Sequence, residues 1–210
     1  RWAKAHLLPR MAGHRAGADS LRKVVRACAD FNVKYLTIFA FSTENWKRPA
    51  DEVNGLMNIF SDYLDQEVPK LYDEGVQLRH IGNMKELNPT LQKKLKDGIE
   101  KTKENKRLIF TLAINYGGRD EIVHAVQEMI KEGIPAEEVN EQTIREHLYL
   151  ASDTPDPDLV IRTSGEYRTS NFLVWESAYS EWLFTEVYWP DFDKECLRKA
   201  ILEYGNRSRR

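Results

Sequence analysis

The sequence of 210 residues predicts an α/β fold, a single domain with a mainly parallel central sheet flanked by helices. Strand-sized apolar segments alternate with helical segments of ten or more residues, a pattern typical of βαβ units. No repeat, low-complexity stretch or linker rich in Gly, Ser or Pro divides the chain. A chain of this length buries about 70% of its unfolded surface, so one domain over residues 1–210 needs no stabilising crosslink.

The charge balance and the cysteine content limit the function classes. The chain has 31 Lys and Arg against 33 Asp and Glu, so a basic surface for nucleic acid is not expected and an anionic ligand needs a local Arg cluster. Cys28 and Cys196 form no CxxC motif, which disfavours a disulfide framework and a Cys-ligated zinc site. No segment approaches 18 uninterrupted apolar residues. We therefore expect a cytoplasmic protein without a transmembrane helix or signal peptide.

Apolar periodicity predicts the individual elements in chain order. Pro49 followed by Asp51 and Glu52 marks the start of the second helix, because Pro and acidic residues favour a first helical turn. Pro69 is expected to kink or end that helix. We expect helices over 16–31, 51–72, 89–103, 119–131, 141–149 and 193–204, and strands over 35–41, 76–81, 107–115, 159–161, 172–175 and 182–187.

Three polar or Gly-bearing segments follow predicted strands, at 42–49, 115–119 and 162–171. Ligands of open parallel sheets bind outside the carboxyl ends of the strands, so these segments are the candidate binding loops. Segment 162–171 combines two Arg, several hydroxyl groups and a Gly, which suit phosphate oxygens. The alternative is a solvated loop whose Arg side chains pair with Glu166.

Three further features have both a functional and a structural interpretation. The segment 13–17 begins a helix, where free N–H groups favour an anion, but an isolated His, as His14 is, is more often a helix-start residue bonded to the backbone. Segment 42–49 could cap the next helix, although Trp46 and Arg48 exceed what a cap requires. Glu181 stands between aromatic residues at a strand start, as a hard-metal ligand or as the partner of a nearby Arg.

Together these segments resemble the cis-prenyltransferase family, and within it the bacterial undecaprenyl diphosphate synthases. The resemblance spans essentially the whole chain in family order. Each fragment is weakly specific alone, and the combination is highly specific. The stretches that carry it are RWAK at 1–4, AGHRAG at 12–17, LTIFAFSTENWKRP at 36–49, INYGGRDEI at 114–122, PDLVIRTSGEYRTSNFLVW at 157–175 and AYSEWLFTEVYWPDF at 178–192.

The resemblance implies a transferase that extends an allylic diphosphate, usually farnesyl diphosphate, with isopentenyl diphosphate. Each new double bond is cis, Mg²⁺ is required, and undecaprenyl diphosphate, a lipid carrier for cell-wall synthesis, is the implied product. The implied enzyme is a homodimer in which 182–189 and the C-terminal helix contribute to the interface. A peripheral membrane contact would serve product release, and the tail 207–210 would reach the neighbouring active site or an anionic membrane.

Site residues are implied by matching positions. The allylic diphosphate site matches Arg1, Arg10 and His14, with Trp2 beside them. The substrate-binding loop matches Ser42, Thr43, Glu44, Trp46 and Arg48, and Asn45 matches the family's proton acceptor. Because a neutral amide is a poor base, Asn45 alternatively orients a water, a diphosphate oxygen or the substrate. The isopentenyl diphosphate site matches Arg162, Arg168, Thr169 and Ser170, and the Mg²⁺ ligand matches Glu181.

A growing apolar product requires an apolar tunnel, which residues 51–72, 35–41 and 107–115 have the composition to wall; the alternative is that they are plain core. The family places an Asp-Gly-Asn-Gly run, whose Asp holds the metal, directly before the Arg-Trp pair with which this sequence begins. We therefore expect the natural protein to continue upstream with an apolar strand ending in that run. The alternative function is a noncatalytic binding subunit of a two-subunit cis-prenyltransferase, which AGHRAG and FSTENW disfavour.

Overall fold

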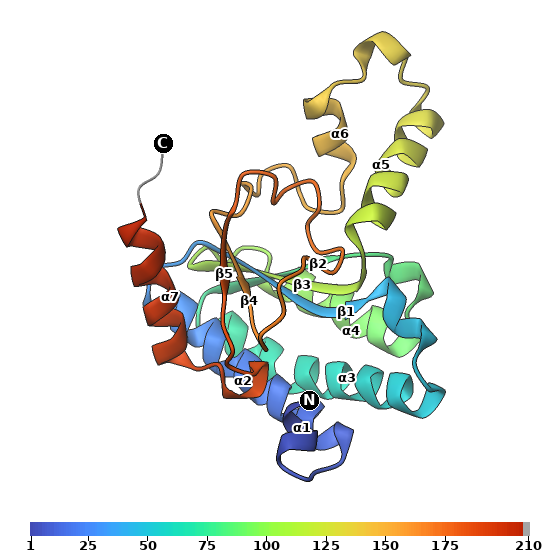
Figure 1. The fold of residues 1–210 in the computed structure, drawn as a ribbon. Coiled ribbons are helices and arrows are strands. Elements are labelled where there is room, and N and C mark those ends of the chain that lie inside the picture. Colours follow the sequence, from blue (N-terminus) through green and yellow to red (C-terminus); the bar gives the residue numbers. More distant parts are fainter. Residues whose placement is uncertain (208–210) are drawn as a thin grey trace.

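The computed structural model describes residues 1–207 and consists of two parallel sheets with helices packed around them (Figure 1). The first sheet has the order β1-β3-β2, and the second pairs β4 with β5. The strands are β1 (Tyr35–Ser42), β2 (Val76–Ile81), β3 (Leu108–Tyr116), β4 (Leu159–Arg162) and β5 (Glu181–Phe184). The helices are α1 (Trp2–Ala5), α2 (Arg10–Asp30), α3 (Ala50–Asp73), α4 (Pro89–Thr102), α5 (Gly118–Glu132), α6 (Glu141–His147) and α7 (Lys194–Asn206).

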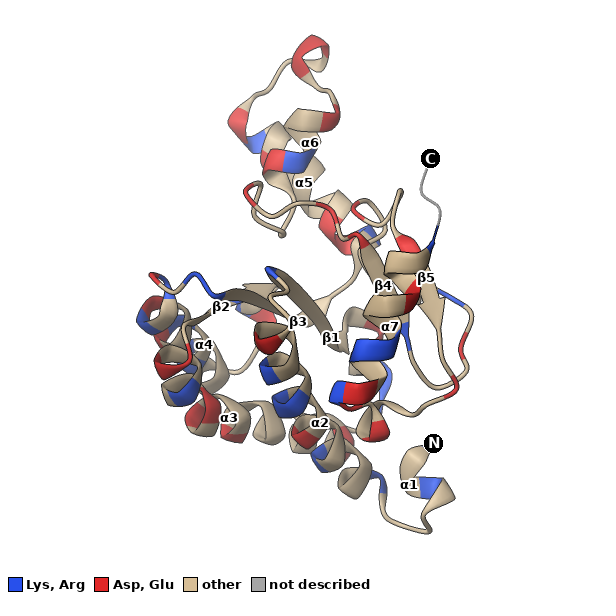
Figure 2. Ribbon diagram, turned by 90° about the vertical axis from the view of Figure 1, so that its left-hand side faces the viewer, with Lys and Arg blue, Asp and Glu red and all other residues tan. Residues whose placement is uncertain are grey.

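Helices α2, α3 and α4 lie on one side of the three-stranded sheet, and α5 and α6 form an arm that projects from the opposite side (Figure 2). Every described strand pair is parallel, with Tyr35 opposite Ile109 and Val76 opposite Leu108 at the start of the first sheet. The α/β class and the parallel pairing are therefore confirmed. The described strands form two sheets, whereas one central sheet was expected.

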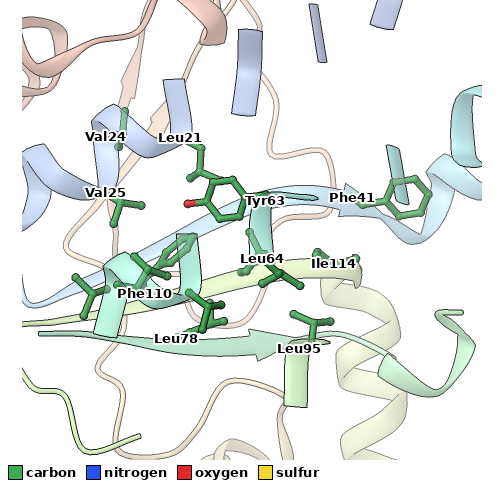
Figure 3. Packing of buried hydrophobic residues seen from close by; sticks show 14 of the residues in the cluster. Leu21, Val24, Val25, Phe41, Tyr63, Leu64, Leu78, Leu95, Phe110 and Ile114 are labelled. Atoms are coloured by element: carbon green, nitrogen blue, oxygen red, sulfur yellow. The ribbon is translucent and has the colours of Figure 1, made fainter. Parts of the chain in front are cut away.

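The main core fills the space between this sheet and its helices (Figure 3). Central strand β3 is almost wholly buried because it pairs on both edges and is covered on its faces. Its Phe110 and Ile114 are fully buried, and burial of such apolar side chains stabilises the fold by about 1.5–3 kcal/mol each. Leu21, Val24 and Val25 of α2 and Tyr63 and Leu64 of α3 belong to the same cluster.

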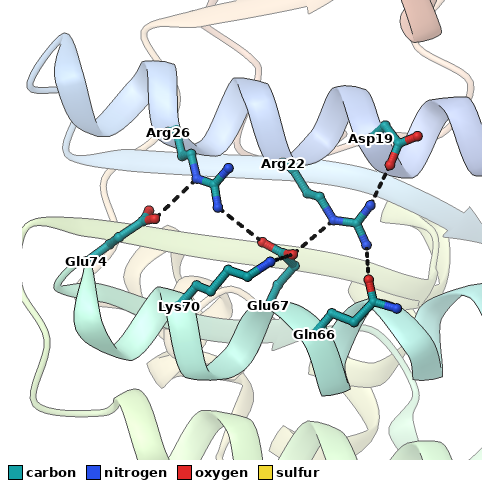
Figure 4. A network of polar contacts seen from close by, with 7 residues as sticks. All are labelled: Asp19, Arg22, Arg26, Gln66, Glu67, Lys70 and Glu74. Atoms are coloured by element: carbon teal, nitrogen blue, oxygen red, sulfur yellow. Dashed lines mark hydrogen bonds and ion pairs between the residues drawn. The ribbon is translucent and has the colours of Figure 1, made fainter.

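A polar network joins α2 to α3 along their solvent side (Figure 4). The carboxylate of Glu67, only 3% exposed, accepts hydrogen bonds from Arg22 Nε at 3.0 Å and Lys70 Nζ at 2.7 Å. Arg26 lies 3.8 Å from Glu67 and 3.2 Å from Glu74. These contacts pair a nearly buried charge and fix how the two helices cross.

Several predicted boundaries differ from the structure. Helix α2 begins at Arg10 rather than at 16. Helix α3 spans Ala50–Asp73 and so confirms the expected range 51–72 to within a residue at each end. Pro69 does not end this helix, because Val68 and Leu71 are buried against its neighbours. Residues 172–175 form turns rather than a strand, because Leu173 has a φ of +44°, outside the extended region.

Both cysteines are free, as expected. Within residues 1–207, no helix combines the length and apolar content that crossing a bilayer requires. Of the expected tail contact, residues 208–210 lie outside the described residues, and Arg207 pairs with Glu181 and Glu203.

A buried pair of acids lies where the arm joins the body. Glu121, in the first turn of α5, accepts hydrogen bonds from the Tyr116 hydroxyl and from the backbone N–H of Leu150. Glu121 and Glu176 are both fully buried. Burial, reinforced by the nearby charge of Glu121, raises the pKa of Glu176 to about 8. The folded chain therefore holds a proton here that the unfolded chain releases at a lower pH.

The raised pKa of Glu176 predicts that the free energy of unfolding falls as the pH rises. Between an unfolded pKa of 4.5 and a folded pKa of about 8, the folded state binds more protons, so raising the pH across this window favours unfolding. Glu176→Gln removes the titrating group, and its melting temperature should fall less than that of wild type between pH 5 and pH 8. One pKa unit corresponds to about 1.4 kcal/mol, or roughly 2–4 °C for this size, and we expect at least that difference.

Thermal unfolding followed by circular dichroism across this pH range measures the effect. The exposed Glu104, changed to Gln, is the matched control and should keep the wild-type slope. Equal slopes for Glu176→Gln and wild type would show that the buried pair does not titrate in this range.

Candidate active site

A cavity of about 1610 Å³ lies between α2, α3, β1 and β4. Apolar side chains of α3, namely Leu56, Ile59 and Phe60, form part of its wall. Charged side chains predicted from the sequence also border it. The predicted site residues among its lining are Arg1, Trp2, Arg10, His14, Arg48, Arg162 and Thr169. The cavity thus combines an apolar wall with cationic groups, as a ligand with an apolar tail and an anionic head requires.

Arg10 and His14 of α2 and Arg48 of the loop before α3 meet at Glu52, in the first turn of α3. Arg10 Nη1 lies 2.9 Å from Glu52 Oε2, and Arg48 Nη1 and His14 Nε2 lie 3.1 and 3.3 Å from Oε1. Burial raises the pKa of Glu52, but the hydrogen bonds from Arg10 and His14 outweigh it and the net pKa is lowered. Glu52 is therefore ionised at neutral pH and holds three donors together. The sequence analysis did not identify it as a site residue, although its i,i+4 spacing from Arg48 is a charge-pair signal.

His14 is held neutral by its surroundings. Burial lowers its pKa below 6.5, against the opposing effect of the hydrogen bond to Glu52. A neutral imidazole protonated on Nε2 donates to Glu52 Oε1 in this geometry. Both helix N-termini, at Arg10 and Ala50, begin beside these side chains and favour an anion there. Trp2, which borders the same cavity, donates from Nε1 to Asp191 at 2.8 Å.

The loop after β1 is capped by its own side chains. Ser42 and Asn45 form a capping box at the short 3₁₀ helix Thr43–Lys47, in which Asn45 Oδ1 accepts from the backbone N–H of Ser42 at 3.2 Å. These two residues cap the 3₁₀ helix inside the segment, whereas the next long helix, α3, has Pro49 as its N-cap and no side-chain cap. The capping box also occupies the amide oxygen of Asn45 with a structural hydrogen bond, which competes with any use of that oxygen as a proton acceptor.

Trp46 is held by a residue that the sequence analysis did not identify. Its indole Nε1 donates to Asn115 Oδ1 at 2.7 Å, and its ring packs edge-on against Phe41 at 5.1 Å. Asn115 is fully buried with a φ of +54°, and its Nδ2 donates to Asn83 O at 3.0 Å and Glu86 Oε2 at 2.9 Å. Asn tolerates this left-handed backbone better than most residues, which explains its use at the end of β3.

The loop after β4 gathers a second cationic group. Arg162 Nη2 lies 3.3 Å from Ser170 Oγ, while Glu166 forms ion pairs with both Arg1 and Arg168. Glu166 is only 8% exposed, so the pairing considered as the alternative is present, but in a buried setting rather than a solvated one. Thr169 borders the cavity between these residues. The ion pairs of Glu166 thereby join the loop after β4 to Arg1, which precedes α1.

Glu181 lies apart from these groups. It begins β5 opposite Leu159, whereas Arg162 stands at the far end of the same strand pair, and it is not among the described residues that border the cavity. Its carboxylate accepts from Arg207 at 2.8 Å. No group of three or more His, Cys, Asp or Glu that could hold a metal occurs within the described residues. The geometry shows Glu181 as an Arg partner, and its Mg²⁺ role stays a prediction.

Comparison with known proteins identifies relatives along the whole chain. A family model described as "Putative undecaprenyl diphosphate synthase" matches residues 1–210. The isoprenyl transferase of Heliobacterium mobile is 49% identical over 214 aligned residues, covering 100% of this chain and 82% of the relative. That of Clostridium tetani is 47% identical and is covered to 84%.

Two solved structures share the fold. Lavandulyl diphosphate synthase from Lavandula x intermedia, in complex with dimethylallyl diphosphate, superposes with a TM-score of 0.95 at 33% identity, covering 100% of this chain and 92% of that one. "A probable undecaprenyl diphosphate synthase" from Campylobacter jejuni superposes with a TM-score of 0.84 at 35% identity, covering 93% of this chain and 91% of that one.

Proposed function

Because this chain belongs to the family of cis-prenyltransferases, or isoprenyl transferases, we propose that it condenses isopentenyl diphosphate with an allylic diphosphate. Farnesyl diphosphate is the proposed allylic substrate and undecaprenyl diphosphate the proposed product. The observation that carries this proposal is one cavity with an apolar wall from α3 and two cationic groups at its border, around Glu52 and around Glu166. A prenyl diphosphate has the matching parts, a hydrocarbon and a dianionic head.

The two cationic groups suit the two diphosphates. Arg10, His14 and Arg48 would hold the allylic diphosphate, where negative charge builds up as it leaves. Arg162 and Arg168, with Thr169 and Ser170, would hold isopentenyl diphosphate. Guanidinium groups suit this role because they donate to phosphate oxygens in pairs and remain charged.

The cavity would serve as the product tunnel. A cationic allylic centre reacts with water unless apolar side chains exclude it, and Leu56, Ile59 and Phe60 supply such a wall. Asn45 would orient a substrate group or a water, because its amide oxygen already caps the loop and an amide is a poor base.

A second candidate function is the noncatalytic subunit of a two-subunit enzyme. The clustering of Arg10, His14 and Arg48 around one carboxylate favours catalysis, since a binding subunit has no need to assemble a diphosphate site. Activity of the natural full-length protein, purified without a partner subunit, separates the two functions.

The direct test is incubation with radiolabelled isopentenyl diphosphate, Mg²⁺ and either farnesyl or dimethylallyl diphosphate, followed by chromatography of the products. Long apolar product from farnesyl diphosphate is expected. In the same assay, Arg168→Ala should raise KM for isopentenyl diphosphate about ten- to a hundred-fold, the effect of one lost charge-assisted bond, and KM for farnesyl diphosphate less than three-fold.

Lys93→Ala, which removes an exposed cation on α4, is the control and should leave both KM values unchanged. No product from the natural full-length protein with either allylic substrate would overturn the proposed function. Equal rises of both KM values in Arg168→Ala would overturn the assignment of the isopentenyl site while leaving the function intact.

Mg²⁺ is the proposed cofactor, and when bound it would neutralise the diphosphate leaving group. Mg²⁺ usually takes one or two protein carboxylates plus phosphate oxygens, so a single carboxylate is compatible with it, but Glu181 is engaged with Arg207. If Glu181 is a ligand, Glu181→Gln should raise the Mg²⁺ concentration for half-maximal activity about ten-fold or more.

Glu195→Gln, which also removes a carboxylate paired with an Arg, is the matched control. An unchanged Mg²⁺ titration in Glu181→Gln would leave Glu181 as a structural partner of Arg207. Full activity in the presence of EDTA would contradict the Mg²⁺ requirement itself.

A homodimer and a peripheral membrane contact complete the proposal. The expected interface lies on 182–189 and α7, and exposed apolar side chains also occur on α5 at Val123, Val126 and Ile130. Light scattering at micromolar concentration should give twice the chain mass, and a monomer would contradict the dimer. Co-sedimentation with anionic vesicles tests the membrane contact, which absence of binding would exclude.

A further inference from the structure

Asn171 joins three segments that are distant in the sequence. Its backbone carbonyl accepts from Gly118 N at 2.7 Å, and its Oδ1 accepts from Arg119 N at 2.9 Å. Its Nδ2 donates to Glu44 Oε1 at 2.9 Å. The residue therefore connects the loop after β4, the start of α5 and the loop after β1.

The loop after β1 and the loop after β4 are both candidate substrate loops. Asn171 directly follows Ser170 of the proposed isopentenyl site, and Glu44 lies in the loop that contains Trp46 and Arg48 of the proposed allylic site. Arg119 belongs to the first turn of α5, which follows the buried strand β3. The contact with α5 thus anchors Asn171 to the core, and the contact with Glu44 extends that anchor to the second loop.

The local backbone requires an asparagine. Asn171 has a φ of +65°, a conformation that Asn adopts more readily than most residues. Its side chain both accepts and donates, which aspartate at neutral pH cannot do. Gly117 makes room for the contact, since a Cβ there would lie 2.7 Å from Asn171 Nδ2 and 2.8 Å from Thr43 Oγ1.

The Glu44 side of the contact is ionised. Burial raises the pKa of Glu44, but backbone and side-chain hydrogen bonds, including that from Asn171, outweigh it and lower the pKa overall. The bond between the two side chains is therefore charge-assisted, which makes it stronger than a bond between neutral groups.

We propose that Asn171 is a positioning residue that fixes the two substrate loops relative to each other, so that the two bound diphosphates present their reacting carbons at bonding distance. This inference rests on the proposed function. Bond formation between two substrates needs reacting atoms held about 3–3.5 Å apart, and small displacements slow it strongly. Each loop binds its own substrate, so loss of the tie affects the reaction step more than either binding step.

Asn171→Asp tests this with almost no change in shape. The variant keeps the acceptor for Arg119 N and replaces the donor to Glu44 by a carboxylate that repels it. We expect kcat to fall about ten-fold, with each KM within about three-fold of wild type. Binding of farnesyl diphosphate alone, titrated by tryptophan fluorescence, should keep the wild-type stoichiometry, which shows that the protein is folded.

Asn88→Asp is the matched control. Asn88 caps α4 by accepting from Leu91 N at 2.9 Å and lies outside the cavity lining, and Asp caps a helix equally well, so kcat should not change. A wild-type kcat in Asn171→Asp would overturn the positioning role. Inactivity of the natural full-length wild-type protein would instead overturn the proposed function, so the two failures are distinguishable.

A double-mutant cycle with Glu44→Gln identifies the contact responsible. In the Glu44→Gln background, the introduced amide can donate to the introduced carboxylate, which restores the bond in the reverse direction. Asn171→Asp should then lower kcat by no more than about two-fold. The same loss in both backgrounds would overturn the inference.

The double variant also provides a test for the case in which Asn171→Asp is unstable. If Asn171→Asp does not fold by itself, the double variant should recover both farnesyl diphosphate stoichiometry and turnover. A double variant that remains unfolded, or that folds without recovering turnover, would contradict the role assigned to the contact.

Discussion

The parallel pairing of β3 with β1 and β2 is the constraint on which the rest of the structure depends. Because the strands run in one direction, each must be followed by a helix that returns the chain, and α3 and α4 do this on one side of the sheet. The loops that leave β1 and β3 therefore emerge together. β3 is paired on both edges and buried on both faces. Its C-terminal end at Tyr116 is therefore held in place, and the loops are positioned relative to it.

The loops are held by polar contacts rather than by apolar packing. Asn115, at the end of β3, fixes Trp46, and Asn171 ties the β4 loop to Glu44 and to the start of α5. Arg10 and Arg48 are likewise paired with Glu52, and Arg168 is paired with Glu166. The carboxylates offset the repulsion between the guanidinium groups and so hold these groups close together in the folded chain. A diphosphate with two or more negative charges can then compete for donors that are already in place.

Much of this arrangement was predictable because it follows from local pattern. The apolar runs predicted the three strands of the first sheet to within a residue or two. Of the three polar segments after strands, 42–49 and 162–171 contribute residues to the cavity lining, and 115–119 does not. The contacts that fix these loops were not predictable. Asn115 and Asn171 bond to residues that are distant in sequence, as Glu52 does in its bond to Arg10, and a single sequence carries no local signal for such partners. Only the pair of Glu52 with Arg48 has a local signal, its i,i+4 spacing.

Sequence patterns also misled where tertiary contacts override the local preference of a segment. Residues 172–175 have strand composition, yet left-handed residues on either side of Phe172 turn the chain there. Pro69 breaks helices in isolation, yet the packing of its neighbours extends α3 past it. In both segments tertiary contacts decided between local alternatives. The contact of Glu181 with Arg207 at the amino end of β5 likewise became visible only in three dimensions, and the Mg²⁺ role of Glu181 stays a prediction.

The account's central claim is that the cavity receives a prenyl chain while its cationic border receives the diphosphate. A crystal structure with a non-reactive thiolo analogue of farnesyl diphosphate tests this most directly. We predict diphosphate oxygens within hydrogen-bond distance of Arg10, His14 or Arg48, and hydrocarbon density against Leu56, Ile59 and Phe60 of α3. A diphosphate bound away from these three residues, or a hydrocarbon chain lying outside the cavity, would contradict the account.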